Sequence, residues 1–502
     1  MATTTAPKLE RQGLEGEMPR PINVTMIGAG SFFTNSILKD VALIPNSKGG
    51  ELRLIDIDGT RLELAAKLMQ KILEEAGESG KWKVRASTDR NELLPGTDYI
   101  VNSIEVSGLD CVRFDNDIPL EYGVSQCIGD TIGPGGLFKS LRTIPVWIDI
   151  LRDAEKHCPN AQVLNYTNPM NMMCLAAQRA TSMNVVGLCH SVQGTSRMLA
   201  KYAGVPYEDM KWTCAGINHL AWFTTLRGPR SEVRSPGGSA EGPRSEVRGP
   251  DRQPPTDPDR QPPTANRQPD ADGFVDLYPI LMAQAADRDS DFAKAEPVRT
   301  DMMLHFGAFI TESSGHLSEY VPYYRTSKRL IEKYTIERYG GQESFYADEW
   351  PGWRKAQDEQ RAKMISGEEP IKLERSEEYG AWIIEAIEKH RPIVVYGNVA
   401  PNEGLIPNLM SDGCVEVACL IDRNGVQPTK YGRLPRQMAA VCESNMRMFD
   451  LGVEACLNRS KETAVHALLH DPLTSAVCCP AEIKEMVMKL FDAEELWLPE
   501  YR

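Results

Sequence analysis

The chain has 502 residues, of which 41% are hydrophobic and 25% charged, and its net charge is −14. This composition is ordinary for a globular enzyme, and the length predicts two interlocked domains or one large α/β domain. An acidic chain repels phosphate backbones, so we expect no nucleic-acid partner. No apolar run approaches the roughly 20 residues that span a bilayer, and residues 1–20 lack an apolar signal segment. We therefore expect a cytoplasmic protein without a membrane partner.

The N-terminal part of the chain alternates between strand and helix patterns. Residues 1–20 are polar and are predicted to form a flexible tail. Short apolar runs predict strands at 23–27, 51–56, 99–102, 162–165 and 185–189, and helical spacing predicts helices at 31–43 and 61–76. This alternation predicts a doubly wound parallel sheet of the Rossmann type over residues 21–200.

Residues 228–272 interrupt the pattern with internal repeats. Residues 228–234 recur at 242–248, and residues 251–256 recur at 259–264. Apolar residues are nearly absent, so no core can offset the entropy of ordering the segment. We predict a disordered surface insertion. The alternative is a proline-rich ligand for a partner protein.

The C-terminal part is richer in helix. Helical spacing is present at 377–389 and 482–495, and strand patterns at 393–396 and 414–420. We expect residues 201–502 to form a second, mixed α+β domain that closes over the site, binds substrate and metal, and provides the contacts of a homodimer or homotetramer. The fold class is then α/β, similar overall to lactate and malate dehydrogenases.

The first strand leads into Gly28-Ala-Gly30, a turn that lets the backbone approach a pyrophosphate at a helix N-terminus. The usual third glycine is replaced by Phe33. Asp56 ends the second strand, where an acid can bind both ribose hydroxyls and favour NAD over NADP; Asp58 is a competing candidate. The alternative is a glycine turn without a nucleotide. The other predicted cofactor residues are Ser31, Phe32 and Arg61.

Polar residues follow three predicted strands. Asn168 precedes a proline that stops its strand, Cys189 ends the next strand, and His219 follows a further apolar stretch. Ligands of open α/β sheets bind at the carboxyl ends of the strands, so we expect these side chains near the nicotinamide. Cys189 and His219 are half of a possible divalent metal site. The alternative is a buried thiol and a hydrogen-bonded core histidine.

A second glycine-rich loop spans residues 130–136, from Asp130 to Gly136. It either lines a sugar or phosphate pocket with backbone N–H groups or is only a tight turn. Arg142 is expected to form a surface ion pair. The polar segments at 311–320, 397–398 and 404–408 are either solvated loops or the facing wall of an active site.

Together, these motifs resemble glycoside hydrolase family 4, and within it the α-galactosidases that act on melibiose. The resemblance covers roughly residues 21–500, and the insertion is a departure from it. The segments that carry it are Gly28–Ser31, Asn168–Met170, Gly187–Thr195, Cys214–His219, Thr311–Ser314, Gly397-Asn398, Val415–Leu420 and Gln427–Lys430.

The resemblance implies a reaction unlike hydrolysis by two carboxylates. NAD oxidises C3 of the sugar, the C2 proton becomes acidic and is removed, and the glycosidic oxygen leaves by elimination. Water then adds, and the hydride returns to C3. NAD is therefore a resident catalyst.

The resemblance also implies roles for single residues. Cys189 and His219 hold manganese or another divalent metal, which polarises the C2 and C3 oxygens. Asn168 binds the sugar hydroxyls, with Asp130 and His316 as further substrate contacts. His190 replaces the aspartate of phosphosugar-specific members and acts as the acid. The candidates for the C2 base are Asp301, Tyr320 and His316, and we favour Asp301 because a carboxylate can serve at neutral pH.

Three alternatives remain open at this stage. A family relative could act on α-glucosides, α-galacturonides or α-glucuronides. A dehydrogenase of 2-hydroxy acids would turn over NAD without metal, although neither the Cys-His pair at 189–190 nor the chain length fits it. A non-catalytic NAD sensor would need no combination of Cys189, His219 and Asn168.

Overall fold

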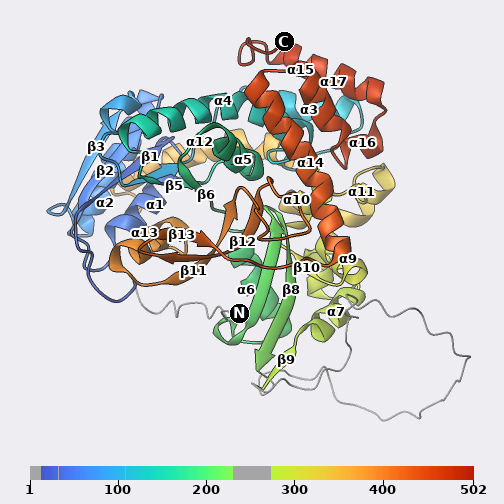
Figure 1. Ribbon diagram of the computed structural model, residues 1–502, viewed down its shortest axis with the longest axis horizontal. Coiled ribbons are helices and arrows are strands. Elements are labelled where there is room, and N and C mark those ends of the chain that lie inside the picture. Colours follow the sequence, from blue (N-terminus) through green and yellow to red (C-terminus); the bar gives the residue numbers. More distant parts are fainter. Residues whose placement is uncertain (1–12, 32, 108, 230–272) are drawn as a thin grey trace, which may run out of the picture.

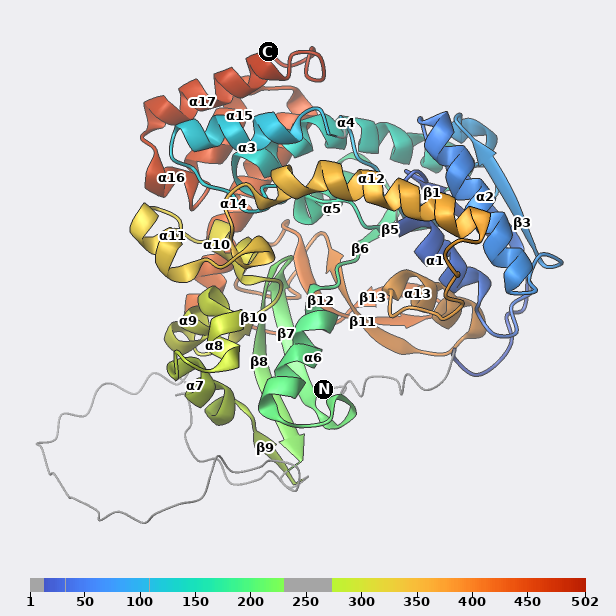
Figure 2. The ribbon, with the colours of Figure 1, turned by 180° about the vertical axis from the view of Figure 1, so that it is seen from behind.

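One continuous sheet runs through the molecule and carries both predicted domains (Figures 1 and 2). The computed structural model describes residues 13–31, 33–107, 109–229 and 273–502. Within these ranges the sheet has thirteen strands. Helices lie against it on both sides, so the strands that carry the predicted site are held between two layers.

The N-terminal strands lie parallel in the order β3-β2-β1-β4-β5-β6. This is the strand order of a dinucleotide-binding sheet, and the doubly wound prediction is confirmed. The strands are buried in the middle because helices cover both faces. Their bounds are β1 (Ile22–Ile27), β2 (Gly50–Ile55), β3 (Trp82–Ser87), β4 (Tyr99–Asn102), β5 (Gln162–Asn165) and β6 (Asn184–Gly187). The helices between them are α1 (Phe33–Ala42), α2 (Gly59–Glu75), α3 (Val112–Glu121), α4 (Gly133–His157) and α5 (Met170–Ala180).

The second half extends the same sheet with antiparallel strands, so the predicted boundary at residue 201 does not separate two sheets. β11 (Ile393–Val399) joins β6 through the pair Asn398 and Gly187. Beyond it lie β12 (Val415–Asp422), β7 (Lys211–Ile217), β8 (Leu220–Pro229) and β10 (Phe309–Ile310), with β9 (Phe274–Asp276) on β8 and β13 (Gly425–Pro428) on β12. A mixed second half, as predicted, therefore sits directly beside the last parallel strand.

The helices of the second half surround this extension. α12 crosses from the α10 side of the molecule to α2 (Figure 2), and α14 packs against α4 and α5. The bounds are α6 (Ser191–Ala203), α7 (Tyr278–Ala286), α8 (Asp291–Ala295), α9 (Pro297–Phe306), α10 (Ser314–Tyr320), α11 (Lys328–Tyr334), α12 (Phe345–Ser366), α13 (Tyr379–Lys389), α14 (Arg436–Asn458), α15 (Lys461–Leu469), α16 (Thr474–Val477) and α17 (Pro480–Ala493). None of the helices that the structure describes combines the length and apolar composition needed to cross a membrane.

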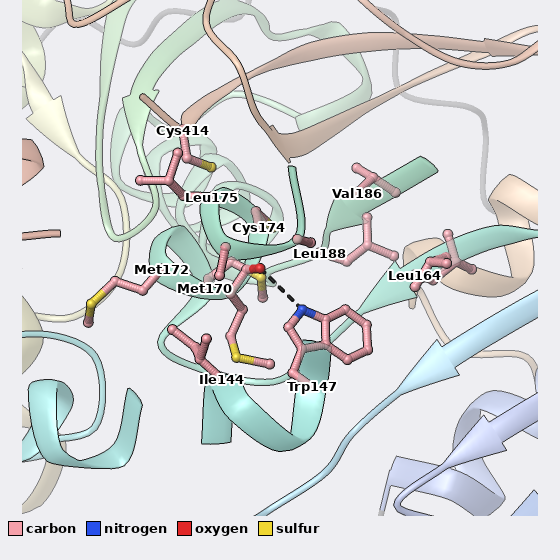
Figure 3. Close-up of a cluster of buried hydrophobic side chains, with 14 of the residues drawn as sticks. Ile144, Trp147, Leu164, Met170, Met172, Cys174, Leu175, Val186, Leu188 and Cys414 are labelled. Carbon is pink, nitrogen blue, oxygen red and sulfur yellow. Dashed lines mark hydrogen bonds between the residues drawn. The ribbon is translucent and has the colours of Figure 1, made fainter. Parts of the chain in front are cut away.

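The main core lies behind the predicted site, where α4 and α5 pack on β5 and β6 (Figure 3). Trp147 of α4 is fully buried, and its indole N–H donates to the Met173 carbonyl at 3.2 Å. Met170 and Cys174 of α5 lie against Gly187, where an added Cβ would come within 2.5 Å of the Met170 sulfur. This packing fixes α5, and with it the loop that carries Asn168, against the end of β6.

Two boundaries differ from the sequence prediction. Residues 13–20, predicted as part of a flexible tail, are anchored to α13: the Leu14 N–H donates to Glu385 at 2.8 Å, and Lys389 donates to the Leu14 carbonyl at 2.8 Å. Gly228 and Pro229, predicted as insertion, end β8 and pair with Val275 and Phe274. The rest of the predicted insertion, 230–272, lies outside the described residues, as do 1–12.

The twelve cysteines are free thiols, and all but Cys189 and Cys479 are buried. Burial raises the pKa of several of them, for example Cys419 to about 12. Such thiols are inert core residues. Cys189, which is half-buried, is the exception considered next.

Candidate active site

Three side chains from distant segments meet at the carboxyl edge of the sheet. Cys189 follows β6, His219 lies in the two-residue turn between β7 and β8, and Glu312 lies between β10 and α10. One donor atom of each lies within 4.8 Å of the others, and Glu312 Oε2 is 3.6 Å from His219 Nε2. His219 and Glu312 have positive φ angles of 62° and 70°. Non-glycine residues rarely adopt this conformation, and it is often found at functional sites.

A thiolate, an imidazole and a carboxylate are together a donor set for a divalent metal. Burial raises the pKa of Cys189, and the Glu312 carboxylate raises it further. Burial would also favour the neutral form of Glu312, but His219 and His316 outweigh it and lower the pKa of that carboxyl. The three donors are therefore arranged to bind a cation, with Glu312 as the ionised carboxylate. Cys189 and His219 were predicted as metal ligands from the sequence, whereas Glu312 was not.

Glu416 lies beneath this group on β12 and is fully buried. Burial, and next the neighbouring Cys189, raise the pKa of its carboxyl well above the ordinary value. Its Oε1 lies 3.5 Å from the amide nitrogen of Asn398 on β11. The neutral carboxyl of Glu416 therefore lies beside Cys189. No local pattern in the sequence predicts that Glu416 reaches the site.

One face of α10 lines the site. His316 and Tyr320 are four residues apart on α10, the spacing that places side chains on the same side of a helix, and Glu312 lies just before its N-cap. The ring centroids of His219 and His316 are 4.6 Å apart, and those of His219 and Tyr320 are 6.2 Å apart. His316 Nδ1 lies 3.4 Å from Glu312 Oε1. The sequence signal for Glu312 is its place in the polar segment 311–320, directly before this helix.

Tyr320 is fully buried, and its hydroxyl has no hydrogen bond of good geometry among the described residues. Burial raises the pKa of this phenol, and Asp130 and Glu319 raise it further. A buried hydroxyl without a protein partner is costly. It is therefore available to a ligand.

Asp130 connects the second glycine-rich loop to the site. Its Oδ2 accepts from the Asn168 amide at 3.3 Å and lies 3.5 Å from Lys139, and its Oδ1 is 3.9 Å from His316. Burial opposes the charge, but Lys139 and then His316 hold the pKa of Asp130 well below its ordinary value. Asn168, Asp130 and His316, the three predicted substrate contacts, are thus brought together.

Glu319 fixes the loop in front of Asp130. Its carboxylate accepts the backbone N–H groups of Ile128 at 2.7 Å and Gly129 at 3.2 Å. Gly135 and Gly136 lie in the first turn of α4, close to this loop. A Cβ added at Gly135 would lie 2.2 Å from the Gly129 carbonyl oxygen, and one added at Gly136 would lie 2.5 Å from the Thr131 carbonyl carbon. These glycines serve close packing, and the loop presents the Asp130 side chain.

His190 follows Cys189 in the chain, and its side chain is about half exposed. Its ring stacks on Phe33 with centroids 6.0 Å apart, and its Nε2 pairs with Glu378 at the start of α13. Burial of the ring lowers its basicity, but Glu378 more than compensates and raises the pKa of His190. Phe33, at the missing third glycine, also stacks on Tyr166 at 6.3 Å. An aromatic wall thus connects the glycine turn with Cys189.

The glycine turn has the geometry predicted for it. Gly28 has φ +82°, and an added Cβ would lie 2.4 Å from the Ser103 carbonyl oxygen. The Gly30 N–H donates to Asp56 Oδ2 at 2.6 Å. Asp58, the competing acid, instead caps α2 by accepting the N–H groups of Thr60 and Arg61. Asp56 is therefore the acid beside the turn. Phe32 lies outside the described residues.

An arginine from α12 holds the same turn. Arg361 is almost fully buried and donates from Nη1 to the Gly30 carbonyl at 2.8 Å and from Nη2 to the Ser31 carbonyl. The guanidinium of Arg61, a predicted cofactor residue, pairs with Asp358 of α12 at 3.2 Å. Residues of the second half of the chain thus contact the glycine turn directly. The sequence did not predict this contact.

Asp301, the favoured C2 base, is not brought to this site. Its carboxylate accepts from the hydroxyls of Tyr324 at 3.0 Å and Tyr334 at 3.3 Å and pairs with Arg288. No described contact joins it to Cys189 or the other donors. Its hydrogen-bonding capacity is taken up by this tyrosine pair.

Arg142 also differs from the prediction of a surface pair. It is buried, and it pairs with Asp115 at 2.6 Å and with Glu494. Both carboxylates are needed because a buried guanidinium is stable only when its donors are satisfied. These two ion pairs join α3 and α4 to Glu494, which follows α17.

Comparison with known proteins identifies the family. A model described as family 4 glycosyl hydrolase matches residues 23–205, and one described as the family's C-terminal domain matches residues 270–474. The chain belongs to family 4 of the glycosyl hydrolases. The chain is 35% identical to an α-galactosidase of Bacillus subtilis over 491 residues, which cover 95% of this chain and 99% of that protein. An α-galactosidase of Rhizobium meliloti is 32% identical over 485 residues, which cover 95% and 89%.

More distant relatives and solved structures share the fold. An α-galacturonidase of Lachnoclostridium phytofermentans is 26% identical over 507 residues, covering 95% of this chain and 97% of that one. The structure of lplD from Bacillus subtilis has a TM-score of 0.75 at 24% identity and covers 94% and 99% of the two chains. A 6-phospho-α-glucosidase from gut microorganisms, solved with NAD and Mn²⁺, has a TM-score of 0.73 at 21% identity and covers 96% and 100%. These likenesses confirm the predicted α/β fold.

Proposed function

We propose that the protein is an α-galactosidase that requires NAD and a divalent metal, with manganese as the metal. The observation that carries the proposal is the group Cys189, His219 and Glu312, with donor atoms within 4.8 Å, on the same sheet edge as the glycine turn. Two relatives above 30% identity are α-galactosidases, which supports the substrate. A metal group beside a dinucleotide turn supports the redox route over hydrolysis by two carboxylates.

The residues present fit both cofactors. Any side chain at Gly28 would collide with Ser103, so the turn keeps its backbone open to a pyrophosphate at the start of α1. Asp56 lies at the end of β2, where the ribose of NAD binds in such sheets. For the metal, the Nδ1 of His219 is buried without a hydrogen bond among the described residues, so the imidazole has no other fixed role.

Bound NAD would supply a reversible hydride acceptor at C3 of the sugar, and a bound divalent cation would polarise the C2 and C3 oxygens and lower the pKa of neighbouring hydroxyls. The chain orients the sugar for this chemistry. Asn168 and Asp130 form a polar wall for its hydroxyls, and the pairing of Asp130 with Lys139 keeps that wall fixed. The buried core beneath α5 holds Asn168 in place and excludes water from behind.

Tyr320 is our candidate for the base that removes the C2 proton. Its hydroxyl is buried, free of a hydrogen bond of good geometry and beside His219, whereas Asp301 is held by two tyrosines elsewhere. His316, the other candidate, is already held by Ser313 at 3.2 Å and by Glu312. His190, held by Glu378 at the cofactor side, is placed to give a proton to the leaving oxygen.

The test is hydrolysis of p-nitrophenyl α-galactoside in D₂O, with and without NAD, Mn²⁺ and reductant. We expect activity only when NAD and Mn²⁺ are present, and deuterium at C2 of the released galactose. Full activity after removal of NAD and chelation of metal would overturn the proposed function. Heat-treated enzyme with the same cofactors controls for uncatalysed exchange.

A further inference from the structure

A small cleft opens beside Asp130, between α3, the start of α4 and α12. Tyr346 and Trp350 of α12 form one wall, with ring centroids 5.1 Å apart and planes at 18°. Lys139 and Glu105 lie opposite, joined at 3.0 Å. Half-buried aromatic faces beside paired polar groups suit a sugar, which presents C–H faces and hydroxyls to its site.

Both cations that line the cleft are paired with carboxylates. Lys139 Nζ lies 3.0 Å from Glu105 and 3.5 Å from Asp130, and the lysine side chain is only 9% exposed. Arg142, the other cation of the lining, is held by Asp115 and Glu494. The lining contains three carboxylates, at Glu105, Asp115 and Asp130, and these two cations. Its formal charge is therefore −1, and an anionic group entering it would be repelled.

The cleft begins at Asp130, on the side of His316 that faces away from Glu312 of the metal group. In a pyranose ring, C2 and C3 are on one side, and C5 with its C6 substituent is on the opposite side. His316 separates the two ends of the site, with Glu312 of the metal group at 3.4 Å on one nitrogen and Asp130 at 3.9 Å from the other. A sugar with C2 and C3 at the metal group therefore directs C6 towards Asp130 and Lys139.

We propose that this cleft receives the C6 end of the substrate, and that Glu105, by neutralising Lys139, makes the enzyme select a neutral hexoside over a hexuronide. The proposal rests on the proposed function and adds its discrimination among α-glycosides. A C6 carboxylate would need an unmatched cation, whereas a C6 hydroxyl can donate to Glu105 or Asp130. Phosphorylated sugars are rejected for the same reason.

The test compares kcat/KM for p-nitrophenyl α-galactoside and p-nitrophenyl α-galacturonide, with NAD and Mn²⁺ present. The wild-type enzyme should prefer the galactoside by about a hundredfold or more, the size expected when like charges meet in a partly buried site. Glu105→Gln keeps the shape, leaves Lys139 paired with Asp130 alone, and changes the formal charge of the lining from −1 to 0. It should raise the galacturonide-to-galactoside ratio by about tenfold or more.

Glu63→Gln, an exposed change on α2, removes the same charge far from the cleft and should leave the ratio unchanged. As a second measurement, galacturonate should inhibit galactoside cleavage more strongly in Glu105→Gln than in the wild type. A wild-type enzyme that cleaves the galacturonide as well as the galactoside, or a folded Glu105→Gln enzyme with an unchanged ratio, would overturn the inference and leave the α-galactosidase assignment intact. A wild-type enzyme that cleaves neither substrate would instead overturn the proposed function itself.

Discussion

The Glu312 carboxylate lies 3.6 Å from Nε2 of His219, a contact that joins the turn between β7 and β8 to the start of α10. It completes a group of three donors, of which Cys189 is the third. Two protein ligands leave a metal dependent on substrate and water, whereas a third adds a charged oxygen, the donor type that manganese prefers. The role of Glu312 is therefore the first prediction to test.

Glu312→Gln keeps the size of the side chain and removes its charge. We expect the affinity for Mn²⁺ to fall by about a hundredfold or more, because a charged ligand is lost while Cys189 and His219 remain. Mn²⁺ titration of binding by calorimetry, and of galactoside cleavage, measures the change. Glu332→Gln, exposed on α11, is the matched control. An unchanged Mn²⁺ affinity in the folded variant would remove Glu312 from the metal group.

Tyr320→Phe and Asp301→Asn distinguish the two candidates for the C2 base. Tyr320→Phe should lower kcat by about 10² to 10⁴ and abolish deuterium incorporation at C2, with little change in KM, because only the proton acceptor is lost. Asp301→Asn should retain the exchange but lower the Tm, since Tyr324 and Tyr334 lose a charged acceptor. The reverse pattern would assign the base to Asp301.

Arg361→Met tests whether α12 braces the cofactor turn. The variant loses donors to the Gly30 and Ser31 carbonyls, so the Kd for NAD should rise by about tenfold, and activity should return at saturating NAD. Equilibrium dialysis measures the Kd directly. Lys355→Met, exposed on the same helix, should bind NAD as the wild type does. Equal Kd values for both variants would mean that the contact supports the fold only.

Asp471 predicts a pH dependence of stability. Burial raises the pKa of this carboxyl to about 6, although the hydroxyl and N–H of Thr474 oppose the shift. The folded state therefore binds the proton more tightly than the unfolded chain. The stabilisation is fully present below the unfolded value of 3.8 and is lost as pH rises through about 6.

Asp471→Asn resembles the protonated form at every pH. Its Tm relative to the wild type should rise between pH 4.5 and 7.5, by an amount that corresponds to about 3 kcal/mol at most. Thermal unfolding of both proteins across this range measures the difference. Asp149→Asn, at an exposed site on α4, should show a nearly constant difference. A constant difference for Asp471→Asn as well would show that this carboxyl does not titrate between pH 4.5 and 7.5.

Local sequence patterns were enough to predict the parallel sheet, the glycine turn and the segments that hold Asn168, Cys189 and His219. These depend on local patterns: apolar strands, turn residues, and the rule that the carboxyl ends of parallel strands meet at one edge. The family resemblance added the expected chemistry. The polar segment 311–320, which contains Glu312, His316 and Tyr320, was also local.

Which polar side chains contact one another depends on how distant elements pack in the folded chain. Glu416 and Arg361 reach the site from a strand and a helix far along the chain, and no local pattern distinguishes them from other charged residues. Asp301 was favoured because its residue type suits a base, but the direction of α9 turns it towards Tyr324 and Tyr334. Lys139 likewise becomes paired with Glu105 and Asp130 only when the fold brings α4 to the segment after β4 and to the loop at Asp130. Sequence patterns fix which face of an element is buried, whereas the packing of distant elements fixes what each buried charge contacts.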